Sequence, residues 1–176
     1  MVVFHPLSQS YQEALPVKSR DSQKHRRQSL AIGEWGEAIV ARWLECQGWE
    51  ILHRRWHCRW GELDLVAISP QTLAFVEVKT RGSSNWDAGG LLAITPQKQA
   101  KLQQAAELFL SEHPQFAEFP CRFDAAIVCH RPLPRSQPPA VSSVIPAQIS
   151  LGEPFVLANR QWRFQLYLES AFDAVD

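Results

Sequence analysis

The segment that decides the fold runs from residue 61 to residue 81 and reads GELDLVAI (61–68), SPQT (69–72) and LAFVEVKTR (73–81). The first and third pieces are apolar runs of strand length. The middle piece has the composition of a turn, with a proline among small polar residues. This pattern predicts an antiparallel β-hairpin.

Charged residues interrupt the second apolar run. Side chains alternate between the two faces of a strand, so Glu77 and Lys79 share the face that Phe75 occupies. A strand that is apolar on both faces lies inside a sheet, where an ionised group is costly unless it is paired or bound to a metal. Asp64 lies on the preceding strand, and cross-strand neighbours are about 5 Å apart at Cβ. We therefore expect two carboxylates and a lysine to converge at the end of an apolar sheet.

These residue types suit metal-dependent chemistry on phosphate. Two carboxylates provide the oxygen ligands that Mg²⁺ prefers, and a bound metal polarises a phosphoryl oxygen and lowers the pKa of its water. An ammonium group one pleat further along can orient that water or offset the charge of the phosphate in the transition state. Asp64 and Glu77 are therefore the expected metal ligands, and Lys79 is an expected catalytic residue. The alternative is a purely structural ion pair between Glu77 and Lys79, with Asp64 near the turn.

A series of short motifs resembles the YraN family of small bacterial proteins. The resemblance covers about residues 30–130 and 162–172, and its motifs are Gly33-Glu34-x-Gly36-Glu37, Gly61-Glu62-Leu63-Asp64-Leu65-Val66-Ala67, Phe75-Val76-Glu77-Val78-Lys79-Thr80-Arg81 and Arg122-Phe123-Asp124. It implies an α/β protein of the restriction-endonuclease-like fold, near the archaeal Holliday-junction resolvases. The expected architecture is a mixed sheet of about five strands flanked by two helices, an αβββαβ core followed by a last strand.

The same resemblance implies roles for particular residues. It puts Asp64, Glu77 and Lys79 at nuclease active-site positions and matches Glu37 to the acidic residue of the first helix. It also favours a catalytic role for Gln99 in positioning water or phosphate, and a phosphate contact for Lys98. Position alone leaves Glu37 open to a boundary salt bridge, and Lys98 and Gln99 open to a solvated helix face.

The composition is that of a single globular domain without excess charge. The 176 residues are 45% hydrophobic and 20% charged, and the formal net charge is zero. Between residues 53 and 81, five Lys and Arg residues stand against three Asp and Glu residues, a local balance of +2. This charge argues against tight non-specific DNA binding, which depends on many neutralised phosphates. Weak or structure-selective binding of nucleic acid remains consistent with it.

The candidate contacts to nucleic acid are basic side chains close to the hairpin. They are Arg55, Arg59, Arg81 and Lys98. Five of the seven tryptophans also lie between residues 35 and 60. Packing within the hairpin accounts for Trp56 and Trp60 better than base stacking does, which is the alternative.

The cysteine pattern and the hydropathy of the sequence indicate the cellular compartment of the protein. The cysteines are Cys46, Cys58, Cys121 and Cys129, without a Cys-x-x-Cys pair. This pattern indicates reduced, mostly buried thiols in a cytoplasmic protein. His53, His57 and Cys58 lie close together, but no second pair of ligands has zinc-site spacing. Because the sequence has neither a signal-peptide pattern nor an apolar run near ~18 residues, we expect no export and no membrane span.

The N-terminal region changes character near residue 29. Residues 1–28 show little hydrophobic periodicity, and we expect a disordered extension there, or alternatively a basic arm that touches phosphates. A single nuclease-like domain is expected over residues 29–176. Ser29 is a suitable N-cap for a helix over residues 30–47, and Gly48 is a suitable left-handed C-cap. On this helix Glu34 falls on the solvated face, whereas Glu37 falls at the edge of the apolar stripe.

The other elements follow from periodicity and turn signals. We expect strands over 49–56, 121–129 and 161–168, a mobile loop over 81–94 and a helix over 96–112. Thr95 and Pro96 form a strong helix start, a capping hydroxyl followed by proline. Arg122 and Asp124 are expected to form a supporting ion pair. A Pro/Ser-rich insertion at about 131–158 is expected to be a long irregular loop.

The sequence therefore predicts a Mg²⁺-dependent nuclease-like protein, with Mn²⁺ as a substitute. It would cleave phosphodiester bonds in DNA, including branched or recombination intermediates. One alternative is a non-catalytic nucleic-acid-binding or recombination-accessory module of the same fold. Another is an interaction protein whose buried charges are only structural. The resemblance to the resolvases also implies a homodimer.

Overall fold

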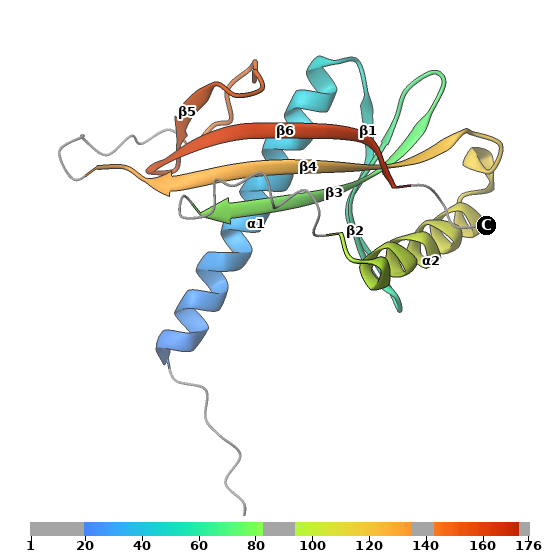
Figure 1. The fold of residues 1–176 in the computed structure, drawn as a ribbon, viewed down its shortest axis with the longest axis horizontal. Coiled ribbons are helices and arrows are strands. Elements are labelled where there is room, and N and C mark those ends of the chain that lie inside the picture. Colours follow the sequence, from blue (N-terminus) through green and yellow to red (C-terminus); the bar gives the residue numbers. More distant parts are fainter. Residues whose placement is uncertain (1–19, 83–93, 135–142, 173–176) are drawn as a thin grey trace, which may run out of the picture.

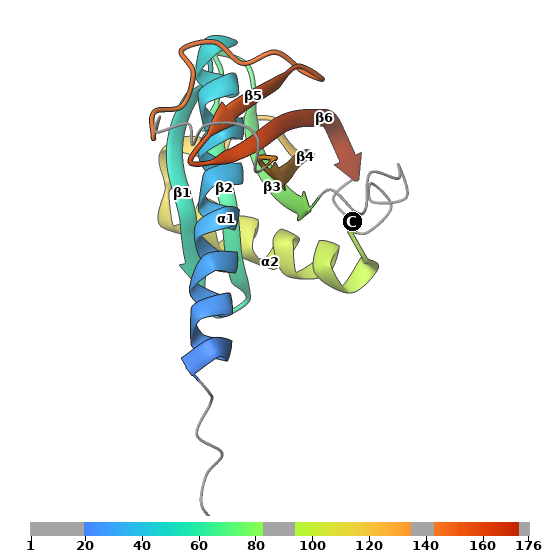
Figure 2. The same ribbon diagram turned by 90° about the vertical axis from the view of Figure 1, so that its left-hand side faces the viewer.

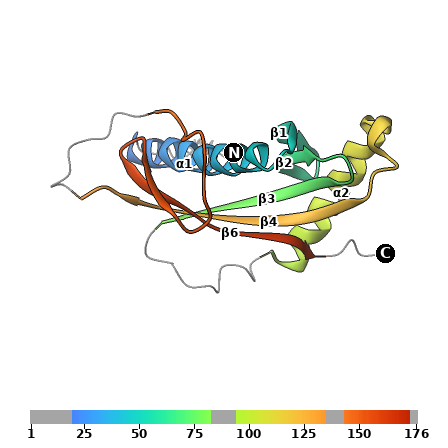
Figure 3. The ribbon, with the colours of Figure 1, turned by 90° about the horizontal axis from the view of Figure 1, so that it is seen from above.

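Within the described residues, six strands form one mixed sheet and two long helices cover its two faces. The computed structural model describes residues 20–82, 94–134 and 143–172. The elements are α1 (Arg20–Cys46), β1 (Glu50–Cys58), β2 (Gly61–Ile68), β3 (Leu73–Gly82), α2 (Pro96–Glu112), the short 3-10 helix η2 (Pro114–Phe116), β4 (Cys121–Pro132), β5 (Pro154–Leu157) and β6 (Arg160–Phe172) (Figure 1). Seen from above, α1 and α2 lie on opposite sides of the sheet (Figure 3). The predicted α/β class and mixed sheet are confirmed.

The order of strands across the sheet is β1-β2-β3-β4-β6-β5. The hairpin predicted from residues 61–81 forms β2 and β3, and its turn is closed by a hydrogen bond from Ser69 N to Thr72 O at 2.9 Å. β3 and β4 are parallel, whereas the other neighbouring pairs are antiparallel. Parallel neighbours need a long crossover connection, and α2 provides it. As predicted, α2 begins with Thr95 as its cap, whose Oγ1 accepts the Lys98 N–H at 3.3 Å.

The sheet separates two apolar clusters. On the α1 side, large fully buried side chains include Ile39, Leu44, Trp162 and Phe164. On the α2 side they include Leu63, Leu73, Phe75 and Phe109. Val76 belongs to the first cluster and Phe75 to the second, so the alternation predicted for β3 is confirmed. Glu77, two residues after Phe75, therefore belongs to the face that α2 covers.

Helix α1 begins earlier than the sequence indicates. It starts at Arg20, so Ser29 lies inside the helix and is not its N-cap. The disorder predicted for residues 1–28 is wrong for residues 20–28, whereas residues 1–19 lie outside the described residues. These N-terminal turns project beyond the sheet (Figure 2). Their Gln, Lys and Arg residues are good helix formers, and extending a helix that is already packed is easier than nucleating one. At the other end Gly48 has a φ of 86°, as expected of a left-handed cap.

The insertion predicted as an irregular loop contains structure. β5 pairs with β6 through a turn in which Ala158 and Asn159 both have positive φ. Ile149 is buried, and the Ala147 carbonyl accepts hydrogen bonds from two side chains of α1. The sheet therefore has six strands instead of about five. Residues 135–142 of the insertion, and most of the mobile loop predicted over 81–94, lie outside the described residues.

The burial of the cysteines and the apolar character of the helices can be compared with the predictions from the sequence. All four cysteines are free, but only Cys129 is buried, whereas Cys46 and Cys121 are exposed. The prediction that the thiols are mostly buried is therefore wrong. In the described ranges, no helix has the length and apolar character that crossing a lipid bilayer requires.

Asp124 ties β4 to the end of β6. Its side chain is 0% exposed, and its carboxylate accepts hydrogen bonds from Arg122 Nε at 3.1 Å, Tyr167 OH at 2.6 Å and Ser170 N at 2.9 Å. The predicted ion pair between Arg122 and Asp124 is thus confirmed. Arg122 also pairs with the exposed Glu169 at 2.8 Å. Three donors from two strands depend on one buried acceptor.

Replacing Asp124 with alanine is expected to lower the free energy of unfolding by about 3 kcal/mol, because it leaves the half-buried Arg122 and the Tyr167 hydroxyl without their acceptor. Urea denaturation measures the loss. Glu169→Ala removes the other carboxylate from the same arginine. Because Glu169 is 64% exposed, this control should cost less than about 1 kcal/mol. Equal losses in the two variants would contradict the assignment.

Gly36 allows α1 to approach β3 closely. A Cβ at this position would lie 1.9 Å from Thr80 Oγ1 and 3.2 Å from Thr80 Cβ. Gly36→Ala is therefore expected to lower the free energy of unfolding by about 1–3 kcal/mol, although alanine favours helix. Thr80→Ala should recover much of this loss in the double variant. Gly33→Ala is the matched control because the nearest atom would be 4.0 Å away, and it should not destabilise the protein. Thermal melts of the four proteins give the comparison.

Candidate functional site

The candidate site lies where β2 and β3 separate. Backbone pairing between them stops at Leu65 and Val76, although both strands continue. Asp64 is the first residue of β2 past this point, and its Oδ2 accepts the Val78 N–H at 2.7 Å. The carboxylate therefore takes the place of a strand-to-strand hydrogen bond and is fixed at the opening of the sheet.

Three charged residues stand in one row across β1, β2 and β3. The pairs on either side of Arg55 put it opposite Asp64, and continuing the β2–β3 register puts Asp64 opposite Glu77. Asp64 is 7% exposed and Glu77 is 4% exposed. The structure thus brings together the two carboxylates that the hairpin pattern singled out, and it buries both of them.

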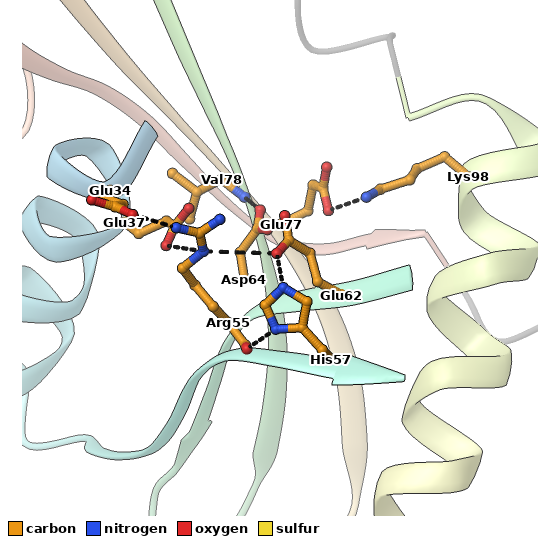
Figure 4. A network of polar contacts seen from close by, with 9 residues as sticks. All are labelled: Glu34, Glu37, Arg55, His57, Glu62, Asp64, Glu77, Val78 and Lys98. Atoms are coloured by element: carbon orange, nitrogen blue, oxygen red, sulfur yellow. Dashed lines mark hydrogen bonds and ion pairs between the residues drawn. The ribbon is translucent and has the colours of Figure 1, made fainter. Parts of the chain in front are cut away.

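Two lysines from different elements converge on Glu77. Lys79 Nζ, from β3, lies 2.7 Å from Glu77 Oε1. Lys98 Nζ, from the first turn of α2, lies 3.0 Å from Glu77 Oε2 (Figure 4). The second contact has the distance of an ion pair but not the alignment of a hydrogen bond, so Oε2 is buried without a hydrogen bond. Both lysine side chains are about one-third exposed, so a ligand at the opening can reach them.

Arg55 gathers the remaining acidic residues. Its φ of 53° kinks β1, and its guanidinium lies 2.6 Å from Glu34 and 3.7 Å from both Glu37 and Glu62 (Figure 4). Glu34, expected on the solvated face, is exposed but paired. Because the charge of Arg55 is shared among three carboxylates, Arg55 organises this acidic cluster.

Burial raises the pKa of two of these carboxyl groups. The pKa of Asp64 rises from 3.8 to about 7, mainly through burial and then through the charge of Glu77. The pKa of Glu37 rises from 4.5 to about 7 through burial, with Glu62 and Glu34 adding to the rise and Arg55 opposing it. Both groups therefore hold their protons to a higher pH than exposed carboxyl groups do. A cation placed among them would favour the ionised forms.

The donor set of the site consists of carboxylate oxygens, which suit a hard cation such as Mg²⁺. In the part of the chain that the structure describes, no three Asp, Glu, His or Cys side chains form a ready-made metal cage. Mg²⁺ does not need one, because it commonly binds one or two carboxylates and keeps waters or substrate phosphates as its other ligands. Asp64 and Glu77 are the residues able to hold it here.

Three more of the predicted residues are on the elements that border this centre or in the turn between β1 and β2, and they contact residues other than Asp64 and Glu77. The Gln99 side-chain amide donates to Ile94 O at 3.0 Å, within the start of α2. The Arg59 guanidinium lies over the Trp60 ring, 5.0 Å from its centroid. Arg81 stands two residues beyond Lys79 on β3, opposite Cys129 of β4.

Two further members of the cluster were not singled out from the sequence. His57 Nε2 lies 2.9 Å from Glu62 Oε2, and His57 Nδ1 contacts the carbonyl of Arg55. Glu62 therefore links the end of β1 to Arg55. Its signal in the sequence was its place in the same motif, two residues before Asp64. Nothing in the sequence marks His57 as a member of this cluster, because its position depends on the kink at Arg55.

Comparison with known proteins identifies relatives of the whole domain. A family model described as "Uncharacterised protein family UPF0102" matches residues 36–128. The chain is 43% identical over 169 residues to UPF0102 protein AM1_3954 of Acaryochloris marina (strain MBIC 11017), covering 89% of this chain and 97% of that protein. It is 43% identical over 162 residues to a UPF0102 protein of Trichodesmium erythraeum (strain IMS101), covering 82% and 90%. It is 41% identical over 153 residues to UPF0102 protein alr1796 of a Nostoc species, covering 83% and 96%. None of these names states an activity.

Proposed function

The chain belongs to the uncharacterised protein family UPF0102, which is the YraN family indicated by its motifs, and we propose that it is a Mg²⁺-dependent nuclease that hydrolyses phosphodiester bonds in DNA. The observation that carries the proposal is the buried Glu77 carboxylate. It stands next to Asp64 where β2 and β3 separate, and it holds Lys79 Nζ at 2.7 Å. Burying two carboxylates side by side is costly, and a bound cation would offset that cost.

Asp64 and Glu77 would hold the Mg²⁺ ion, with Mn²⁺ as a substitute. Glu77 Oε2 is buried without a hydrogen bond, and Asp64 accepts the Val78 N–H through its Oδ2. These oxygens match the hard, oxygen-seeking character of the ion. When bound, the ion would polarise a phosphoryl oxygen and help a water molecule to ionise.

The side chains around the ion would supply orientation and charge. In hydrolysis the water oxygen forms a bond to phosphorus, one bridging P–O bond breaks, the water gives up a proton and the leaving oxygen gains one. Lys79 would orient the attacking water and offset the negative charge that develops on the phosphate. Glu37 would support Asp64 from α1, and Lys98 and Gln99 would contact phosphate or water from the first turn of α2. The positive end of a helix favours an anion at that place.

One observation favours a second candidate, a nucleic-acid-binding module without turnover. Lys79 and Lys98 together compensate the charge of Glu77 without a metal. A protein that needed only a stable basic edge at the sheet would have this arrangement. Binding of DNA that does not depend on metal, with no cleavage of any substrate, would favour this candidate.

The test uses the full chain with linear and branched DNA in Mg²⁺, in Mn²⁺ and in EDTA. We expect cleavage that requires the metal, together with heat of Mg²⁺ binding in calorimetry. Glu77→Gln should remove both signals, whereas Glu107→Gln, on the exposed side of α2, should remove neither. No heat at millimolar Mg²⁺ and no cleavage would reject the nuclease. Cleavage that survives in Glu77→Gln would mean another active site or a contaminant.

A further inference from the structure

A cavity lies beside the acidic cluster, on the α2 side. It has a volume of about 500 Å³ and lies between the end of the β1–β2 hairpin and the first turns of α2. Its lining includes His57, Cys58, Trp60, Glu62, Lys98 and Lys101. This volume lies within the usual range for small-molecule sites and is sufficient for one nucleotide.

The cavity shares two residues with the candidate active site. Lys98 lines it and also reaches Glu77 at 3.0 Å (Figure 4). Glu62 lines it and also lies 3.7 Å from Arg55, at the edge of the acidic cluster. A nucleic-acid strand with a phosphate at Glu77 would therefore have its next nucleotide at the mouth of this cavity.

The lining combines an aromatic ring with cations. Trp60 is 37% exposed at the tip of the hairpin, with the Arg59 guanidinium 5.0 Å from its ring centroid. The packing expected for Trp60 is therefore incomplete, whereas Trp56 packs edge-on against Phe109. Lys101 is exposed and follows Lys98 by three residues, which puts both ammonium groups on one side of α2. Aromatic rings that stack on bases, next to cations that bind phosphate, characterise sites for single-stranded nucleic acid.

We propose that this cavity binds an unpaired nucleotide of a DNA strand, with its base against Trp60 and its phosphates near Lys98 and Lys101. Inside a duplex both faces of a base are already stacked, so a base can meet Trp60 only where it is unpaired or extruded. The substrate class is then DNA with an unpaired tail, flap or branch, and not continuous duplex. This inference rests on the proposed function only for the position of the cleaved phosphate.

The experiment measures binding in EDTA, where turnover is not needed. Fluorescence anisotropy compares a blunt duplex with the same duplex carrying a short unpaired thymidine tail. In the wild-type protein the tail should increase affinity. Trp60→Ala should weaken binding of the tailed duplex by about 5- to 100-fold and leave the blunt duplex unchanged. Trp60→Phe keeps a stacking ring and should retain most of the affinity. Lys101→Gln should make the plot of log affinity against log salt concentration less steep, by the amount expected for about one lost phosphate contact.

Leu151→Ala is the matched control, because it truncates another exposed apolar residue outside the cavity. Thermal melts confirm that each variant folds. The proposal is wrong if the tail adds no affinity, if Trp60→Ala weakens both duplexes equally, or if thymidine monophosphate competes as strongly as the tail. The last result would make the ligand a free nucleotide. Binding that depends on the tail, without cleavage, would reject the nuclease and keep the cavity. Cleavage in Mg²⁺ with no preference for unpaired DNA would support the nuclease and reject the proposed role of the cavity.

Discussion

Replacing Lys79 with alanine is expected to lower the rate of Mg²⁺-dependent DNA cleavage by about 100- to 1000-fold, the usual effect of removing a group that stabilises charge in a transition state. The Lys79 side chain is 31% exposed and its ammonium lies 2.7 Å from Glu77 Oε1. It is therefore held by the metal-binding carboxylate and still open to the substrate. Single-turnover cleavage of a labelled substrate at saturating Mg²⁺ measures the rate of the chemical step.

Loss of rate must be separated from loss of binding. In Lys79→Ala, Glu77 keeps its contact with Lys98, so the affinities for Mg²⁺ and DNA should fall much less than the rate. Adding a small primary amine should restore part of the rate, because it can occupy the space of the missing ammonium group. Arg131→Ala removes an exposed cation from the far end of β4 and should leave the rate unchanged. A Lys79→Ala protein as active as the wild type would remove Lys79 from the mechanism.

The hairpin that carries this lysine could be predicted because every signal for it is local. Two apolar runs of strand length and a turn of four residues define β2 and β3 without knowledge of the rest of the chain. Alternation along a strand then assigns Glu77 and Phe75 to the same face, which the α2-side cluster confirms for Phe75. Thr95 and Pro96 likewise fixed the start of α2, and with it the place of Lys98 near the sheet.

The elements that were wrong depend on signals that are weak or distant in sequence. The first turns of α1 carry no apolar stripe, so periodicity could not detect them. β5 is four residues long, begins with a proline, and turns into β6 through Ala158, a residue that seldom takes a positive φ. Pairing with β6, and not its own sequence, makes this segment a strand.

The conformation of Arg55 is a feature of the site that the local sequence could not predict. Strict alternation would put Trp56 on the opposite face from His53, yet both rings pack edge-on against Phe109 on the α2 side. The positive φ at Arg55 accounts for this, and it leaves the guanidinium among the carboxylates of α1. Neither glycine nor asparagine stands at position 55 or beside it to reveal the kink. The pairing of Arg55 with these acids could therefore not be predicted, and its contact with nucleic acid stays a prediction.

Asp64→Asn is expected to stabilise the metal-free protein while it removes a ligand of the proposed metal. A pKa raised from 3.8 to about 7 corresponds to about 4 kcal/mol of unfavourable free energy for the ionised carboxylate in the folded state. The side-chain carbonyl of an asparagine can still accept the Val78 N–H, and it carries no charge. We expect the free energy of unfolding at pH 8 in EDTA to rise by about 2–4 kcal/mol, measured by urea denaturation.

The dependence of this gain on pH follows from proton binding. Between pH 4 and pH 7 the folded protein keeps a proton on Asp64 that the unfolded chain has already lost, so the stability of the wild type falls as the pH rises through this range. Above pH 7 both states are ionised and the loss is complete. The advantage of Asp64→Asn should therefore be smallest near pH 4, grow to about pH 7 and then stay constant. Glu107→Gln, at an exposed position of α2, should show no such trend.

Saturating Mg²⁺ connects this stability measurement with the proposed function. A ligand that binds only the folded state stabilises it. Mg²⁺ should therefore raise the free energy of unfolding of the wild type at pH 8 and offset much of the loss caused by the buried charge. Asp64→Asn, with one ligand fewer, should gain little from the ion, and the difference between the two proteins should shrink or reverse. A variant that is less stable than the wild type in EDTA at pH 8 would mean that the protein already compensates this carboxylate without any ion. Asp64 would then be a structural residue, and the case for a metal site would be lost with it.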